Sequence, residues 1–139
     1  MKLWSFCVVF AVATAACGGG NKVTGPVPCD TYAGGFLTGN SGGLPGTYDL
    51  KSVCSGMKPD QPGASGSVVI TEADFTATIG TTTYSGRYTL SNPDGITVNL
   101  TSPLPTQLVG TYRLRNDSLA VSGTVGGQRL SLVGTRVVP

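Results

Sequence analysis

A five-residue pattern, Gly-x-Tyr-x-Leu, occurs three times in this 139-residue chain and constrains its fold more than any other feature. The copies begin at Gly46, Gly86 and Gly110. Because side chains alternate between the two faces of a β-strand, the glycine, tyrosine and leucine of each copy share one face. A glycine on the buried face leaves room for a neighbouring ring or a sharp bend. The pattern therefore predicts an antiparallel sheet with one dry and one wet face, and its unequal spacing argues against a solenoid.

The chain from Gly46 onward alternates between short apolar strands and turn signals, with no helical spacing of useful length. Asn92-Pro93-Asp94-Gly95 and Gly126-Gly127 are strong turn signals. We expect strands over residues 47–54, 67–71, 75–79, 83–90, 96–100, 108–115, 119–125 and 128–138. About eight short strands with local connections predict an all-β fold, a small antiparallel up-and-down barrel. The alternative is an immunoglobulin-like β-sandwich.

The same region carries motifs of a known family. It reads Gly-Thr-Tyr-Asp-Leu-Lys-Ser-Val at 46–53, Ser-Gly-x-Tyr at 85–88 and Gly-x-x-Leu-x-Leu at 127–132, followed by Arg136. These motifs resemble those of small bacterial lipocalin-like lipoproteins, and the resemblance covers about the last two-thirds of the chain. Tyr48 stands where lipocalins proper carry a tryptophan. The resemblance implies an up-and-down barrel with room for an apolar ligand.

The N-terminal residues have the form of a secretion signal. Lys2 is followed by an uncharged, mostly apolar run over 3–16, which is too short to span a membrane comfortably. Thr14-Ala15-Ala16-Cys17 resembles a bacterial lipobox, which implies that Cys17 becomes the first mature residue and carries the lipid. Gly18 after the cysteine implies a place in the outer membrane of the cell envelope. The alternative is an ordinary secretory signal cut before Cys17, which would leave a free thiol.

Residues 18–28 are Gly, Pro and polar residues with two isolated valines, so nothing there can bury a face. We expect a lipoprotein signal peptide over 1–16, a flexible tether over 17–28 and a β-barrel domain over 29–139 that begins with a loop segment. Cys29 and Cys54 remain for a disulfide in the oxidising compartment. A redox pair is disfavoured because no Cys-x-x-Cys is present.

Catalytic and metal-binding chemistry has little support in the sequence. The chain has no histidine, which excludes a Ser-His-Asp triad and a Cys-His dyad and leaves few ways to bind zinc, copper or haem. Three weak candidates are more simply read as solvated surface: the Ser-x-x-Lys match at Ser55–Lys58, the carboxylates Glu72 and Asp74, and the arginines Arg87, Arg113 and Arg115. We expect a monomer that is not an enzyme and needs no metal or cofactor. A formal charge of +2 gives no support for nucleic-acid binding.

The inward-facing side chains are therefore the one candidate site. They are mostly Leu, Ile, Val and Phe, and they include Tyr48, Tyr88 and Tyr112, whose hydroxyls could orient a lipid-like ligand. The simpler alternative is that these side chains fill a small barrel completely. Three hypotheses remain: binding of a small apolar molecule, binding of a protein such as a secreted hydrolase that it inhibits, and a purely structural envelope role.

Overall fold

The computed structural model describes residues 28–37, 43–57, 61–62 and 66–139. These residues form a single sheet of ten strands, and no helix occurs among them. The strands are β1 (Gly35–Phe36), β2 (Gly46–Ser55), β3 (Gln61–Pro62), β4 (Gly66–Ile70), β5 (Asp74–Ile79), β6 (Thr82–Ser91), β7 (Gly95–Ser102), β8 (Thr106–Arg115), β9 (Ser118–Val125) and β10 (Gln128–Arg136).

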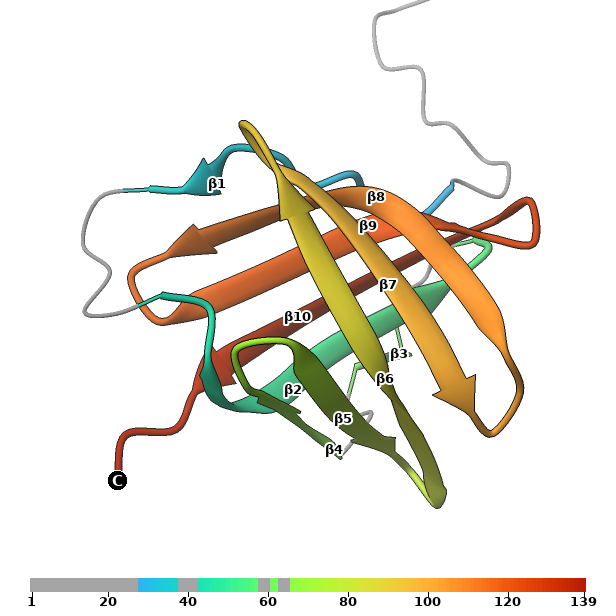
Figure 1. The fold of residues 1–139 in the computed structure, drawn as a ribbon, viewed down its shortest axis with the longest axis horizontal. Helices are drawn as coiled ribbons and strands as arrows, with labels where there is room; N and C mark the ends of the chain where they lie inside the picture. The colour runs from blue at the N-terminus through green and yellow to red at the C-terminus, as the bar shows by residue number, and fades with distance from the viewer. Residues whose placement is uncertain (1–27, 38–42, 58–60, 63–65) are drawn as a thin grey trace, which may run out of the picture.

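The sheet closes on itself as a barrel. Strands β2 and β4 to β10 each pair antiparallel with the next in sequence, and β10 pairs antiparallel with β2. Figure 1 shows β6 and β7 in front of β10 and β2, which form the opposite wall. The two-residue strands β1, parallel to β8, and β3, antiparallel to β2, lie outside this ring. The predicted all-β fold, an eight-stranded up-and-down barrel, is confirmed.

The barrel has two ends that differ in sequence. At one end lie the last residue of β2 and the β5–β6, β7–β8 and β9–β10 turns, which point to the right in Figure 1. We call this the open end, for reasons given below. At the other, the closed end, lie the first residue of β2, the last residue of β10 and the β4–β5, β6–β7 and β8–β9 turns.

Glycines on the inner face allow the strands to curve tightly. A Cβ atom at Gly86 would lie 2.0 Å from the Asn99 carbonyl oxygen, and one at Gly110 would lie 1.9 Å from that of Ser122. Both distances are too short for any side chain, so these two glycines of the Gly-x-Tyr-x-Leu pattern permit close approach of the neighbouring strand. Such approach bends the sheet, which a small barrel requires.

A β-bulge in β2 shifts the alternation of its side chains. In the pairing with β10, Leu50 is opposite Gly134 and Ser52 is opposite Val133, so Lys51 has no partner. Tyr48 and Leu50 face inward as predicted, but beyond the bulge Val53 faces inward and Cys54 outward. A bulge inserts one residue and therefore exchanges the two faces. In β6, Leu90 was expected inward but is 39 % exposed, because it lies next to the end of the strand.

Residues 28–37, which we call the strap, cross the outer face of the barrel from the open end toward the closed end. The Cys29 amide donates to the Gly56 carbonyl, the Tyr32 amide to Ser122 Oγ at 2.7 Å, and the Leu37 amide to the Leu114 carbonyl at 2.9 Å.

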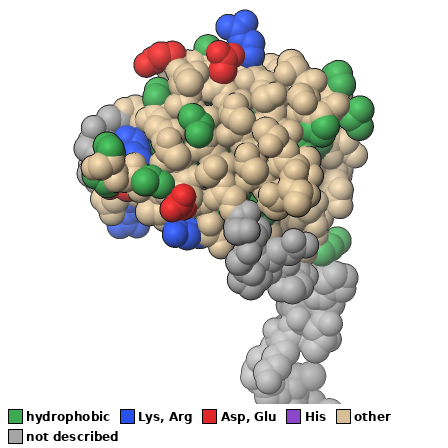
Figure 2. All heavy atoms as spheres, turned by 90° about the horizontal axis from the view of Figure 1, so that it is seen from below, with side chains coloured by type: hydrophobic (Ala, Val, Ile, Leu, Met, Phe, Trp, Pro, Cys, Tyr) green, Lys and Arg blue, Asp and Glu red, His purple; other side chains and the backbone are tan. Residues whose placement is uncertain are grey.

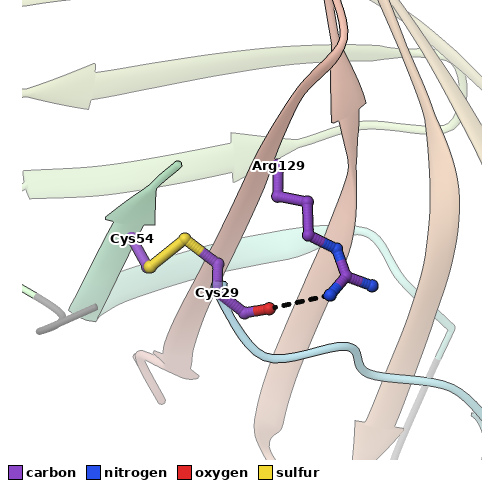
Figure 3. Close-up of a disulfide and its surroundings, with 3 residues drawn as sticks. All are labelled: Cys29, Cys54 and Arg129. Atoms are coloured by element: carbon purple, nitrogen blue, oxygen red, sulfur yellow. Dashed lines mark hydrogen bonds between the residues drawn. A yellow bond between two sulfur atoms is a disulfide. The ribbon is translucent and has the colours of Figure 1, made fainter. Parts of the chain in front are cut away.

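The predicted Cys29–Cys54 disulfide is present, with the Cα atoms 5.7 Å apart, and joins the strap to β2. Arg129 Nη1 reaches the Cys29 carbonyl beside it at 3.5 Å (Figure 3). The strap thus covers outward-facing residues of β9 and is held at both of its ends.

The closed end is sealed by one buried cluster. The Tyr48 hydroxyl donates to the Leu44 carbonyl at 2.7 Å and accepts from Arg136 Nη2 at 2.7 Å. The guanidinium carbon of Arg136 lies 5.3 Å from the centre of the Tyr48 ring, a cation–π geometry. Leu44 and Tyr48 are both almost fully buried. The first and last barrel strands are therefore tied together beneath Leu44.

Candidate functional site: the barrel cavity

The barrel interior is hollow. It contains a cavity of about 320 Å³ to which all eight barrel strands contribute side chains, with Leu44 at its base. The lining residues are Leu44, Val53, Ser55, Val68, Ile70, Phe75, Ala77, Ile79, Tyr84, Tyr88, Ile96, Val98, Leu100, Thr106, Leu108, Leu119, Val121, Val125, Leu130 and Leu132. None of these described residues is charged, and hydroxyl groups are their only polar side-chain atoms. The interior therefore suits an uncharged, largely apolar molecule.

The cavity opens at one end of the barrel. Its lining at the closed end is buried, with Leu44 2 % and Leu119 1 % exposed. Its lining at the open end includes Ser55 and Thr106, which are exposed, and Tyr84, which is half-buried. The cavity is thus an apolar funnel with three hydroxyl groups around its mouth.

The three tyrosines predicted from the sequence do not share one place. Tyr88 lines the cavity and donates its hydroxyl to the Thr71 carbonyl at 2.6 Å. Tyr48 and Tyr112 are buried at the closed end and are not among the lining residues. The Tyr112 ring meets Phe36 edge-on, with ring centres 5.4 Å apart. A role of Tyr48, Tyr88 and Tyr112 in ligand binding stays a prediction, and of these three tyrosines only Tyr88 lines the cavity.

Burial raises the pKa of the hydroxyls of Tyr48, Tyr88 and Tyr112 above the usual value of 10.0. For Tyr48, the neighbouring Arg136 lowers the pKa and offsets part of this effect. All three side chains are therefore neutral at physiological pH. None of these three hydroxyls is therefore a tyrosinate that could attract a cation or act as a base.

The sequence reading missed the hydroxyls at the mouth. Tyr84 lies four residues before Tyr88, so strand alternation places both on one face, but Tyr84 precedes the Gly-x-Tyr-x-Leu copy. Ser55 faces inward because of the bulge at Lys51, and the sequence around Lys51 does not predict this bulge. Thr106 lines the cavity because β8 begins two residues before the predicted start at 108.

The other predicted site residues lie on the surface or outside the described residues. Asp74 pairs with Arg87 at 3.3 Å with both side chains largely exposed, which is a weak interaction. Arg113 lies over the Tyr32 ring of the strap, 5.3 Å from its centre.

Among residues 28–37, 43–57, 61–62 and 66–139, no group of Cys, Asp and Glu comes together as a metal site. No apolar helix of membrane-spanning length is found in that same part of the chain. Lys58, Cys17, the predicted signal peptide over 1–16 and the predicted tether up to residue 27 fall outside it.

Comparison with known proteins yields no family model, no curated protein and no solved structure that matches this chain.

Proposed function

We propose that this protein is a non-enzymatic, lipocalin-like lipoprotein of the bacterial cell envelope that binds a small uncharged apolar molecule inside its barrel. The observation that carries the proposal is the apolar cavity of about 320 Å³, closed at the Tyr48 end and open at the other. The lipobox-like stretch before Cys17 supports anchoring by a lipid, and Gly18 after the cysteine, by the same resemblance, supports an outer-membrane anchor.

The cavity sets the size and polarity of the ligand. At about 30 Å³ per non-hydrogen atom, the volume that a water molecule occupies in the liquid, 320 Å³ holds about eleven such atoms. A ten-carbon alcohol has this size. Its hydroxyl can exchange hydrogen bonds with Ser55, Tyr84 or Thr106, whereas a carboxylate would find no cation among the described lining residues.

A filled interior would favour the alternative functions. A protein-binding module or a structural lipoprotein would gain stability from close packing and has no use for a hollow core. A cavity of this size costs packing energy, so its presence supports a ligand-binding role over the other two.

Native mass spectrometry tests the proposal. The protein beginning at Gly18 is secreted to the periplasm and purified without detergent. We expect an adduct of small mass that is lost on organic extraction, on a chain two hydrogens lighter than its reduced form because of the disulfide. After extraction, we expect 1-decanol to rebind about tenfold more tightly than decanoate. A bare mass that takes up neither compound would overturn the proposal.

A further inference from the structure

The point at which the tether leaves the barrel is at the open end. Pro28, the first described residue, forms a β-bridge with Met57, and the neighbouring Cys29 is covalently fixed to Cys54 at the end of β2. Figure 1 shows the chain entering the barrel on the same side as the β7–β8 and β9–β10 turns. The proposed lipid anchor on Cys17 is therefore connected to the rim of the cavity mouth.

The tether is short compared with the barrel. Cys17 precedes Pro28 by 11 residues, and a flexible Gly-rich chain of that length has a root-mean-square extent of roughly 18 Å. A ten-residue strand such as β2 is roughly 33 Å long, and at a tilt near 40° it spans about 25 Å of barrel height. To place the closed end on the bilayer, the tether would have to stretch along the whole barrel height of about 25 Å, which exceeds its root-mean-square extent of roughly 18 Å. The anchor thus favours an orientation with the open end toward the membrane.

The described turns of the open end are uncharged, and one of them is strongly apolar. They consist of Gly80-Thr81, Pro103-Leu104-Pro105 and Gly126-Gly127. Leu104 is 74 % exposed, and Met57 beside the strap is 51 % exposed. Asp30 and Arg129 lie near this end, but on the side of the strap.

The closed end has the opposite character. Three carboxylates, Glu72, Asp94 and Asp117, lie in the turns there, and Asp74 begins β5. Arg115 and Arg136 end β8 and β10 at the same end, so the closed end carries charges of both signs. This end also exposes apolar side chains, among them Val138. In Figure 2 the visible charged side chains lie toward the left and the top, whereas the right-hand end shows hydrophobic side chains without charges. Charged groups of either sign lose hydration when they enter lipid, a cost that the described turns of the open end do not incur because they carry no charge.

We propose that the open end of the barrel rests on the surface of a phospholipid bilayer, with Leu104 and Met57 in contact with the lipid. The mouth of the cavity then faces the membrane, so an apolar ligand passes between bilayer and barrel without crossing water. The transfer of ligand rests on the proposed function, whereas the docking itself rests on the tether exit, the apolar rim and the charge asymmetry. The lipid on Cys17 and the small apolar rim act together, as two membrane contacts on one molecule do.

Depth-dependent quenching of tryptophan fluorescence tests this orientation. The only tryptophan of the chain is Trp4, which lies in the predicted signal peptide and is removed when Cys17 is lipidated, so each variant is made in the full-length protein with one added tryptophan. The probe variant is Leu104→Trp at the open end. The control is Val138→Trp at the closed end, where the native side chain is equally exposed, 75 % against 74 %. Each lipidated protein is reconstituted into phosphatidylethanolamine–phosphatidylglycerol vesicles that contain brominated acyl chains.

We expect bromine to quench Leu104→Trp at least about threefold more than Val138→Trp, with a blue-shifted emission for the former, because only the rim enters the lipid. Equal quenching of the two variants, or stronger quenching of Val138→Trp, would overturn the docking. The intact mass separates this result from a failure of the proposed function. A lipidated protein without rim quenching leaves the anchored carrier standing, whereas a mass without lipid removes the anchor and the docking together.

Discussion

The substitution Ala77→Phe provides a sharp test of a hollow interior. Ala77 lies on β5, is 6 % exposed and lines the cavity between the neighbouring residues Val68 and Tyr84. An apolar cavity of about 150 Å³ is enough to hold a benzene ring, so the new ring would take about half of the 320 Å³. The matched control is Thr76→Phe, one residue earlier, where the side chain is exposed on the outer face.

The loss of affinity follows from the lost volume. A ten-carbon alcohol would keep about half of its chain in the cavity of Ala77→Phe, so about five CH₂ groups would remain in water. At about 0.8 kcal/mol for each CH₂, binding weakens by about 4 kcal/mol, or roughly a thousandfold. Thr76→Phe should bind the alcohol as the unchanged protein does. Isothermal titration calorimetry with 1-octanol and 1-decanol measures both affinities.

Stability provides the second readout of the same variant. If the cavity is empty, the ring fills it and the free energy of unfolding of Ala77→Phe stays level or rises by about 1–2 kcal/mol. If side chains fill the interior, the ring overpacks it and costs about 1–3 kcal/mol. Urea unfolding distinguishes the two cases. Destabilisation of Ala77→Phe together with unchanged alcohol binding would refute the reasoning.

Three further predictions concern the closed end, the ionisation of the tyrosines and the strap. Tyr48→Phe should lower the free energy of unfolding, measured in urea, by about 3 kcal/mol, because it removes a neutral hydrogen bond to Leu44 and one to charged Arg136. Tyr88→Phe removes one neutral hydrogen bond and should lower it by about 1 kcal/mol. Equal losses in the two variants would contradict the account of the closed end. Burial raises the pKa of Tyr48, Tyr88 and Tyr112, so these tyrosines bind their protons more tightly in the folded state than in the unfolded state. Their contribution to stability is therefore complete below pH 10.0, and above it the free energy of unfolding should fall by up to about 1.4 kcal/mol per pH unit for each tyrosine. A free energy of unfolding that stays constant between pH 9 and 11.5 would count against their burial. Replacing Cys29 and Cys54 by alanine removes a disulfide with a sequence separation of 25 and should lower the free energy of unfolding by about 3–4 kcal/mol. Decanol binding should stay unchanged, because the strap lies outside the barrel. Lost binding would show that the strap shapes the cavity.

The sequence predicted the barrel well because alternation is a local property. In seven of the eight predicted strands, side chains alternate between inward and outward without interruption, and the Gly-x-Tyr-x-Leu pattern occurs in three of the eight. The disulfide could also be predicted, because Cys29 and Cys54 were the two cysteines left after the predicted signal peptide and the predicted lipid anchor accounted for the others. These features depend on residue type and near neighbours, which a single sequence displays.

The site was harder to predict because it depends on register and volume. The bulge at Lys51 arises from the pairing of β2 with β10, which are far apart in the sequence, and it brings Ser55 to the mouth. The same alternating apolar residues could fill a barrel or line a hollow one. Which of the two occurs is decided by the curvature of the whole sheet, and small inward residues such as Ala77 and Gly110 contribute to it only in combination. The sealing of the closed end by Tyr48 and Arg136 is likewise a contact between the first and last barrel strands.

The most direct test of the ligand-binding account is an NMR titration of the methyl-labelled protein with 1-decanol. The account predicts one saturable site, with the largest shifts at methyl groups that line the cavity, such as those of Val68, Ala77 and Ile96, and none at exposed Val138. Shifts that do not saturate, or that appear at exposed methyl groups while the lining methyl groups stay fixed, would contradict a usable interior and with it the proposed function.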